Sequence, residues 1–173
     1  MKVAVVVGNP KPESRTLMVA RAVAQRVCAR FHGVISVELD LVKFAPKMFS
    51  WPDEELAGLN AAVAESDVLV VASPTYKATY TGLLKAFLDR YPNNGLAGVT
   101  AIPVMTAGSP LHGMSIEQGL RPLLVELGAS VPTRGLFFLM SQMDSLEDVV
   151  DAWADDHLRA GGFFAPMPPG TES

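Results

Sequence analysis

The sequence predicts an α/β fold, a doubly wound five-stranded parallel sheet of order 2-1-3-4-5 with helices on both faces. Continuous apolar runs, typical of strands covered on both sides, alternate with segments whose apolar residues recur at helical spacing. Helices of about ten to fifteen residues between strands require right-handed crossovers, which make the sheet parallel. Ligands of such sheets bind beyond the carboxyl ends of the strands, where the winding reverses. We therefore expect the chemistry after strands one, three and four.

The first expected unit is a buried strand, a loop and a helix. Residues 3–7 form a β-branched apolar run that ends at Gly8. After the loop, apolar side chains recur at steps of three and four over residues 17–31, and Gly33 ends this predicted helix. A second strand is expected at residues 35–41.

The middle of the chain begins with an irregular and unusually apolar segment, residues 42–52. Asp53 follows it and is expected to cap the next helix. Residues 68–72 form the third apolar strand, which we expect to end before Pro74.

The remaining units repeat the pattern. We expect a helix at residues 80–88, a strand at 99–105, a helix at 116–127, a strand at 135–139 and a closing helix from 146 to about 159. One domain, residues 1–164, accounts for these units, and the Pro- and Gly-rich residues 165–173 are predicted to be a disordered tail.

The composition excludes several classes of function. The 173 residues, 49% of them apolar, suffice for one packed domain. The formal net charge is −4 and Lys and Arg are dispersed, which argues against nucleic-acid binding. No apolar stretch reaches the roughly 18 residues of a membrane span. The single cysteine, Cys28, can form neither a disulfide framework nor a zinc site. We expect a cytoplasmic protein without a nucleic-acid, membrane or metal partner.

The loop after strand one has the features of a phosphate site. In GNPKPESRT, polar and basic residues precede a helix N-terminus: Asn9, Lys11, Ser14, Arg15 and Thr16. A phosphate needs converging donors and positive potential, and free amides at a helix start supply both. The alternative is a polar loop in which Ser14 only caps its helix. Neither G-x-G-x-x-G nor G-x-x-x-x-G-K-[ST] follows strand one, so a single phosphate is favoured over a dinucleotide or a nucleoside triphosphate.

The loops after strands three and four complete the predicted site. In SPTYKATYTGLLKAFLD, residues 74–77 can provide an apolar wall and backbone amides for a flat ring. Alternatively, Tyr76 and Tyr80 are ordinary packing aromatics. In TAGSPLHG, Gly108 allows close backbone approach, although such a segment is also a common turn.

These loops resemble those of a known family. GNPKPESRT resembles the G-S-x-R-x-x-S pattern of the flavodoxin-like NAD(P)H-dependent FMN reductases, and SPTYKATYTGLLKAFLDRYP resembles their P-x-Y-K-x-x-Y-T-G-x-L-K segment. The residues that fall on the second pattern are Tyr76, Lys77, Tyr80, Thr81, Gly82 and Lys85. The resemblance runs from strand one to strand five, and the chain looks most similar to the FMN reductases of alkanesulfonate monooxygenase systems.

The resemblance implies FMN as the flavin and NADPH or NADH as the co-substrate. It assigns the FMN phosphate to Asn9, Lys11, Ser14, Arg15 and Thr16. It assigns the isoalloxazine ring to Pro74, Thr75, Tyr76 and Lys77, with Thr106, Gly108 and Ser109 on the other edge. The implied reaction is hydride transfer from the nicotinamide C4 to the flavin N5, which requires close stacking but no catalytic acid or base from the protein.

The sequence departs from the family pattern at three positions. Asn9 and Lys11 stand where the family usually has Ser and Arg. Asn9 keeps a hydrogen-bond donor and Lys11 keeps the positive charge, but Lys cannot make the bidentate hydrogen bonds of Arg to a phosphate. Gln118 stands where the sulfonate-linked relatives carry an aromatic residue. The electron acceptor therefore remains open between a flavin-dependent monooxygenase and quinones, azo compounds or metal oxyanions.

Two alternatives lie outside this enzyme class. An electron-transfer flavodoxin would bind FMN without pyridine-nucleotide activity, but the phosphate loops of that family lack charges such as Lys11 and Arg15. A flavin-free interaction module would share only the fold, and the intact polar residues of the loop argue against it.

The aromatic loop, residues 44–51, contains the large apolar side chains of Phe44, Met48, Phe49 and Trp51. On a monomer such a cluster would form an exposed apolar patch. We predict that it packs on a second subunit, in a homodimer or homotetramer, and shapes the flavin pocket. The alternative is a small satellite core beneath a long loop.

Overall fold

All five strands are parallel and lie in the predicted order β2-β1-β3-β4-β5. They are β1 (Lys2–Val7), β2 (Val34–Asp40), β3 (Val68–Pro74), β4 (Thr100–Ala107) and β5 (Leu136–Leu139). The computed structural model describes residues 1–158. The predicted tail at residues 165–173 and the expected helix end near residue 159 lie outside this range.

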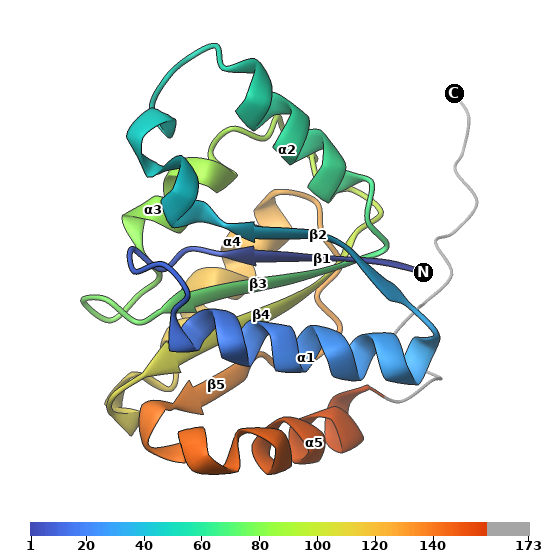
Figure 1. Ribbon diagram of the computed structural model, residues 1–173, viewed down its shortest axis with the longest axis vertical. Helices are drawn as coiled ribbons and strands as arrows, with labels where there is room; N and C mark the ends of the chain where they lie inside the picture. The colour runs from blue at the N-terminus through green and yellow to red at the C-terminus, as the bar shows by residue number, and fades with distance from the viewer. Residues whose placement is uncertain (159–173) are drawn as a thin grey trace.

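Helices cover both faces of the sheet (Figure 1). Helices α1 (Arg15–Phe31) and α5 (Leu146–His157) pack on one face, and α2 (Glu54–Ala64), α3 (Gly82–Leu88) and α4 (Arg121–Glu126) pack on the other. Alternate residues of β1 enter opposite cores, with Val5 on the side of α1 and Val6 on the side of α2. This two-sided burial is the reason why the strands read as continuous apolar runs.

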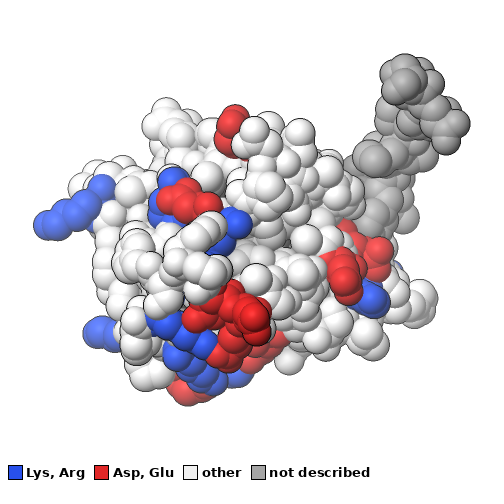
Figure 2. All heavy atoms as spheres, turned by 90° about the horizontal axis from the view of Figure 1, so that it is seen from above, with Lys and Arg blue, Asp and Glu red and all other residues white. Residues whose placement is uncertain are grey.

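Charged side chains on the α2 side of the molecule occur in mixed acidic and basic groups, and most of this face carries neither (Figure 2). On the opposite face, Arg26 of α1 contacts Glu147 at 2.6 Å and also pairs with Asp151, both in α5. No helix among residues 1–158 is long and apolar enough to cross a membrane.

The structure corrects two predicted strand ends. Strand β2 ends at Asp40 because Leu41 begins a 3-10 helix, η1 (Leu41–Lys47), so the segment after it is less irregular than predicted. The expectation that β3 ends before Pro74 is wrong, since Pro74 still pairs with Thr106 of β4. On its other side, the pairing between β3 and β1 stops at Ala72. The missing N–H of Pro74 therefore removes no hydrogen bond to a neighbouring strand.

Two helices also differ from their predicted form. Helix α3 begins at Gly82, and Tyr80 precedes it, because the Thr81 hydroxyl oxygen caps the helix by accepting the Leu84 amide at 3.2 Å. The expected helix at 116–127 opens with a π-helical turn, η3 (Ile116–Leu120), before α4. Gly119 of this turn lies against the segment before α3, because an added Cβ would be 3.1 Å from Thr79 Oγ1.

Candidate functional site

A cavity of about 400 Å³ lies at the carboxyl ends of β1, β3 and β4, and we call it the strand-end cavity. This is the edge at which a doubly wound sheet binds its ligands. The predicted site residues that line it are Asn9, Lys11, Ser14, Arg15, Thr16, Pro74, Thr75, Tyr76, Thr106 and Gly108. The structure thus brings together segments that are far apart in the sequence.

A chain of hydrogen bonds holds the loop after β1 in place. The buried side chain of Asn9 donates from Nδ2 to Thr16 Oγ1 at 3.0 Å and accepts the Lys11 amide at 2.9 Å. The hydroxyls of Thr16 and Thr106 then share a hydrogen bond of 2.8 Å. The side chains of Asn9 and Thr16 therefore tie the loop to itself and to β4.

The N-terminus of α1 supplies the groups that remain for an anion. The Ser14 hydroxyl caps the helix by accepting the Leu17 amide at 3.2 Å. The amides of Arg15 and Thr16, in the first turn, have no carbonyl partner within the helix, and the helix dipole makes this end positive. The side chains of Lys11 and Arg15 are exposed and add positive charge to the cavity wall.

Two acidic residues beside this loop, Glu13 and Glu38, are paired with bases. The Glu13 backbone is left-handed, with φ of 46°, and its amide donates to Asp40 Oδ2 at 3.2 Å. The Glu13 carboxylate lies 3.6 Å from Arg21 and 3.7 Å from Lys43. Arg21 also hydrogen bonds Glu38 and thereby lowers the pKa of that carboxyl. These contacts partly neutralise the negative charge of Glu13 beside a cavity suited to an anion.

A tight turn follows β3 at the cavity mouth. Tyr76 and Thr79 exchange two backbone hydrogen bonds, of 2.8 Å and 3.1 Å, around Lys77 and Ala78. Both central residues are left-handed, with φ of 49° and 66°, a conformation that non-glycine residues adopt mainly where the surrounding structure enforces it. Lys77 lies at the exposed tip, outside the cavity lining.

The wall formed by β3 and β4 contains a polar group without a partner. Thr75 Oγ1 is buried and makes no hydrogen bond with the part of the chain that is described, whereas the Thr75 amide donates to Thr106 O at 2.7 Å. Beyond β4, an added Cβ on Gly108 would meet nothing within 4 Å, so this edge is open. Ser109 accepts the Leu111 amide at 3.3 Å as the cap of a short 3-10 helix and lies outside the lining.

The prediction missed several residues that shape this site. Pro12, Glu13 and Met140 also line the cavity, and Met140 follows the carboxyl end of β5, where the same topological rule applies. The Thr81 hydroxyl donates to Gly8 O, which joins the start of α3 to the loop after β1. In the sequence, the Thr81-Gly82 pair at the start of the expected helix is the feature that could have indicated this contact.

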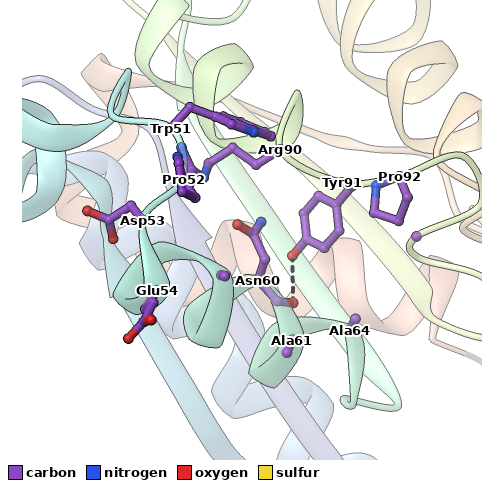
Figure 3. Close-up of a pocket in the computed structure, with 12 residues that line it drawn as sticks. Trp51, Pro52, Asp53, Glu54, Asn60, Ala61, Ala64, Arg90, Tyr91 and Pro92 are labelled. Carbon is purple, nitrogen blue, oxygen red and sulfur yellow. Dashed lines mark hydrogen bonds between the residues drawn. The ribbon is translucent and has the colours of Figure 1, made fainter.

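The aromatic loop divides into buried and exposed residues. Met48 is 2% exposed and Phe44 packs against the same core, which is the main core on the α2 side of the sheet and not a separate satellite core. Phe49 and Trp51 are 87% and 67% exposed. None of the residues 44–51 lines the strand-end cavity of its own chain. Trp51 instead borders a second cavity, beside Arg90 (Figure 3).

Other reactive groups do not form a site. Among residues 1–158, no three His, Cys, Asp or Glu side chains are grouped so that they could hold a metal ion. Cys28 is a free, half-buried thiol whose pKa is raised by burial.

Comparisons with known proteins match most of the chain. The model of the family described as NADPH-dependent FMN reductase matches residues 1–144. An NADH-dependent FMN reductase of Pseudomonas putida is 28% identical over 149 residues, which cover 83% of this chain and 80% of that protein. The FMN reductase (NADPH) of Escherichia coli is 29% identical over 149 residues, covering 83% and 75%. The crystal structure of an NADH:FMN oxidoreductase has a TM-score of 0.78 and 28% identity, covering 94% of this chain and 93% of that one.

Proposed function

The chain belongs to the NADPH-dependent FMN reductase family, and we propose that its strand-end cavity is where FMN binds. The protein is an oxidoreductase with a flavodoxin-like fold that reduces FMN with NAD(P)H. FMN supplies the hydride-accepting ring. The part of the protein is to bind and orient that ring, and we assign no catalytic acid or base.

The observation that carries this proposal is the α1 N-terminus in the cavity wall. The amides of Arg15 and Thr16, the Ser14 hydroxyl and the cations of Lys11 and Arg15 form a set of donors suited to one phosphate. We assign to Asn9 and Thr16 the role of fixing the loop, because their side chains bond to each other and to Thr106.

The remaining lining fits the flat ring. Pro74, Thr75 and Tyr76 after β3 and Thr106 and Gly108 at the end of β4 line neighbouring parts of the cavity. The buried, unpartnered Thr75 Oγ1 is the kind of group that a polar ring edge would satisfy. We place Lys77 and Ser109 at the cavity mouth, since they belong to the same two loops but lie outside the lining.

We further propose that the protein works in the cytoplasm as a homodimer and passes reduced FMN to a flavin-dependent monooxygenase. The support for that acceptor is the resemblance of the chain to the FMN reductases of alkanesulfonate monooxygenase systems. Gln118, exposed in the π-helical turn, favours the alternative of a tightly bound FMN that reduces quinones, azo compounds or metal oxyanions.

The test is NADH and NADPH oxidation by the purified protein with added FMN, before and after desalting. We expect turnover with FMN, and turnover that requires fresh FMN after desalting would identify the flavin as a substrate. Turnover that survives desalting would favour the prosthetic alternative. Riboflavin, which lacks the phosphate, should bind more weakly than FMN, and equal affinities would contradict the assignment of the phosphate loop.

A further inference from the structure

A second cavity, which we call the α2 groove, lies between α2 and the segment that follows α3 (Figure 3). It has a volume of about 470 Å³ and largely apolar walls, formed by Trp51, Ala57, Ala61, Ala64, Tyr91 and Pro92. Its lining shares no residue with the strand-end cavity. The proposed reaction therefore gives no account of this groove.

The floor of the α2 groove contains polar atoms without partners in the part of the chain that is described. Asn60 is 7% exposed and extends from α2 toward Arg90 and Trp51, and its Oδ1 accepts no hydrogen bond (Figure 3). The Nε of Arg90 is buried and donates none. Because a buried polar group without a partner costs about 1–3 kcal/mol, the groove has the character of a surface that another molecule completes.

Arg90 also fixes one wall of the groove. Its guanidinium lies 4.3 Å from the centre of the Trp51 ring and donates to Met48 O at 3.2 Å and to Ser50 O at 3.0 Å. Arg90, in the turn after α3, thus holds the aromatic loop at the edge of the groove. Trp51 and Phe49 nevertheless remain 67% and 87% exposed.

The aromatic loop carries an exposed side chain close in sequence to a residue that lines the groove. Phe49 projects from the loop that forms the rim of the α2 groove, two residues before Trp51. A twofold interface uses the same surface on both subunits, so a protruding side chain and a cavity on that surface can fill each other. Asp53, Glu54 and Arg90 line the groove, whereas most of the surrounding α2 side carries no charge, which favours contact between two identical faces (Figure 2).

We propose that the occupant of the α2 groove is the aromatic loop of a second copy of this chain, with Phe49 entering the groove and the exchange repeated around a twofold axis. Backbone N–H and C=O groups of the incoming loop are the partners that Asn60 Oδ1 and Arg90 Nε lack. The aromatic side chains and Arg90 are the residue types that contribute most to binding at interfaces. This inference rests on the homodimer proposed above and assigns its contact surface.

The experiment is sedimentation of the full chain over a range of micromolar concentrations, with matched variants. Phe49→Gln removes the knob and Ala61→Glu places a charge in the groove wall. Met18→Gln is the control, because Met18 is 48% exposed on α1, on the opposite face of the sheet. Thermal unfolding of each variant verifies that it folds.

We expect the wild-type protein to be a dimer. Phe49→Gln and Ala61→Glu should each raise the dimer dissociation constant at least about tenfold, while Met18→Gln should leave it unchanged. Tryptophan emission should shift to shorter wavelength on association, since Trp51 becomes buried and Trp153 is already 7% exposed. A wild-type dimer that both groove variants preserve would overturn this inference and leave the dimer standing.

A monomeric wild-type protein would overturn both the dimer and this inference. If indole then perturbed the Asn60 side-chain amide in NMR spectra of that monomer, the groove would be a small-molecule site instead. FMN reduction is measured separately, so neither result bears on the activity.

Discussion

The strand-end cavity and the α2 groove are similar in volume, about 400 and 470 Å³, but differ in how their polar groups are partnered. In the cavity, Asn9, Thr16 and Thr106 bond to one another and hold strained backbone at the loops in place, although Thr75 Oγ1 has no partner within residues 1–158. In the groove, Asn60 Oδ1 and Arg90 Nε have no partner within residues 1–158. The cavity is preorganised for a polar ligand, whereas the groove has the features of half an interface.

Gly8→Ala should have the largest effect, because it forces apart the two elements that meet at the cavity. An added Cβ would lie 2.4 Å from Leu84 Cβ and 2.9 Å from Leu84 Cα, so α3 must move. We expect a loss of about 3 kcal/mol in the free energy of unfolding, measured by urea denaturation, together with loss of FMN binding. Gly108→Ala is the matched control, since its Cβ meets nothing within 4 Å. Equal stability of the two variants would show that the cavity is not built on this contact.

Arg15→Ala tests whether the cavity is an anion site. Arg15 is exposed, so the variant should fold normally but bind FMN about tenfold more weakly, a loss of about 1.4 kcal/mol in a charged hydrogen bond. Fluorescence titration measures this affinity. Riboflavin affinity should not change, and an equal loss for riboflavin would place Arg15 away from the phosphate.

Thr106→Val, compared with Asn60→Leu, tests the contrast in polar partners directly. Thr106→Val leaves the buried Thr16 hydroxyl with one partner fewer and should lower the free energy of unfolding by about 1 kcal/mol. Asn60→Leu removes an amide whose Oδ1 has no partner among residues 1–158 and whose donated bond to Phe87 O is long at 3.5 Å. Its effect on the monomer should be smaller. A larger loss of stability for Asn60→Leu than for Thr106→Val would contradict the contrast between the two cavities.

Tyr91→Phe should have the smallest effect at neutral pH and a distinct effect at alkaline pH. Burial raises the pKa of Tyr91 to about 12, while its hydroxyl donates to Asn60 O at 3.1 Å. The stability that the neutral phenol contributes is therefore complete below about pH 10 and is lost as the pH rises toward 12. Tyr91→Phe should lower the free energy of unfolding by at most about 1 kcal/mol at pH 7. The variant should also lose less stability than the wild type as the pH rises from 10 toward 12. Chemical denaturation at several pH values measures both, and an unchanged alkaline slope would contradict the buried phenol.

Much of the fold could be predicted because it depends on local patterns. The apolar run that became β1 and the helical spacing of α1 follow from which faces are buried. The Pro74 prediction failed because the cost of a missing N–H depends on whether a neighbouring strand is present at that level of the sheet. The π-helical turn was not predictable either, since Ile116 and Leu120 both face the core at a spacing that also suits an α-helix.

The candidate site was predicted in place but not in detail. The loops after β1, β3 and β4 do meet in one cavity, because parallel strands end at one edge. The use of each side chain was less evident from the sequence. Asn9, predicted as a phosphate donor, uses one Nδ2 hydrogen for Thr16 Oγ1 and its Oδ1 for the Lys11 amide, which the sequence did not indicate. Met48 and Phe49 looked equivalent, yet one is 2% and the other 87% exposed.

The sequence by itself determined the sheet order, the edge that carries the loops and the family resemblance, since each follows from apolar periodicity and from motifs of adjacent residues. The tertiary structure alone decided which polar groups hold the loop, and that Phe49 is exposed while Trp51 lines the α2 groove. The physical reason is distance along the chain. Thr16 and Thr106 are 90 residues apart in sequence, and only folding brings their hydroxyls within a hydrogen bond.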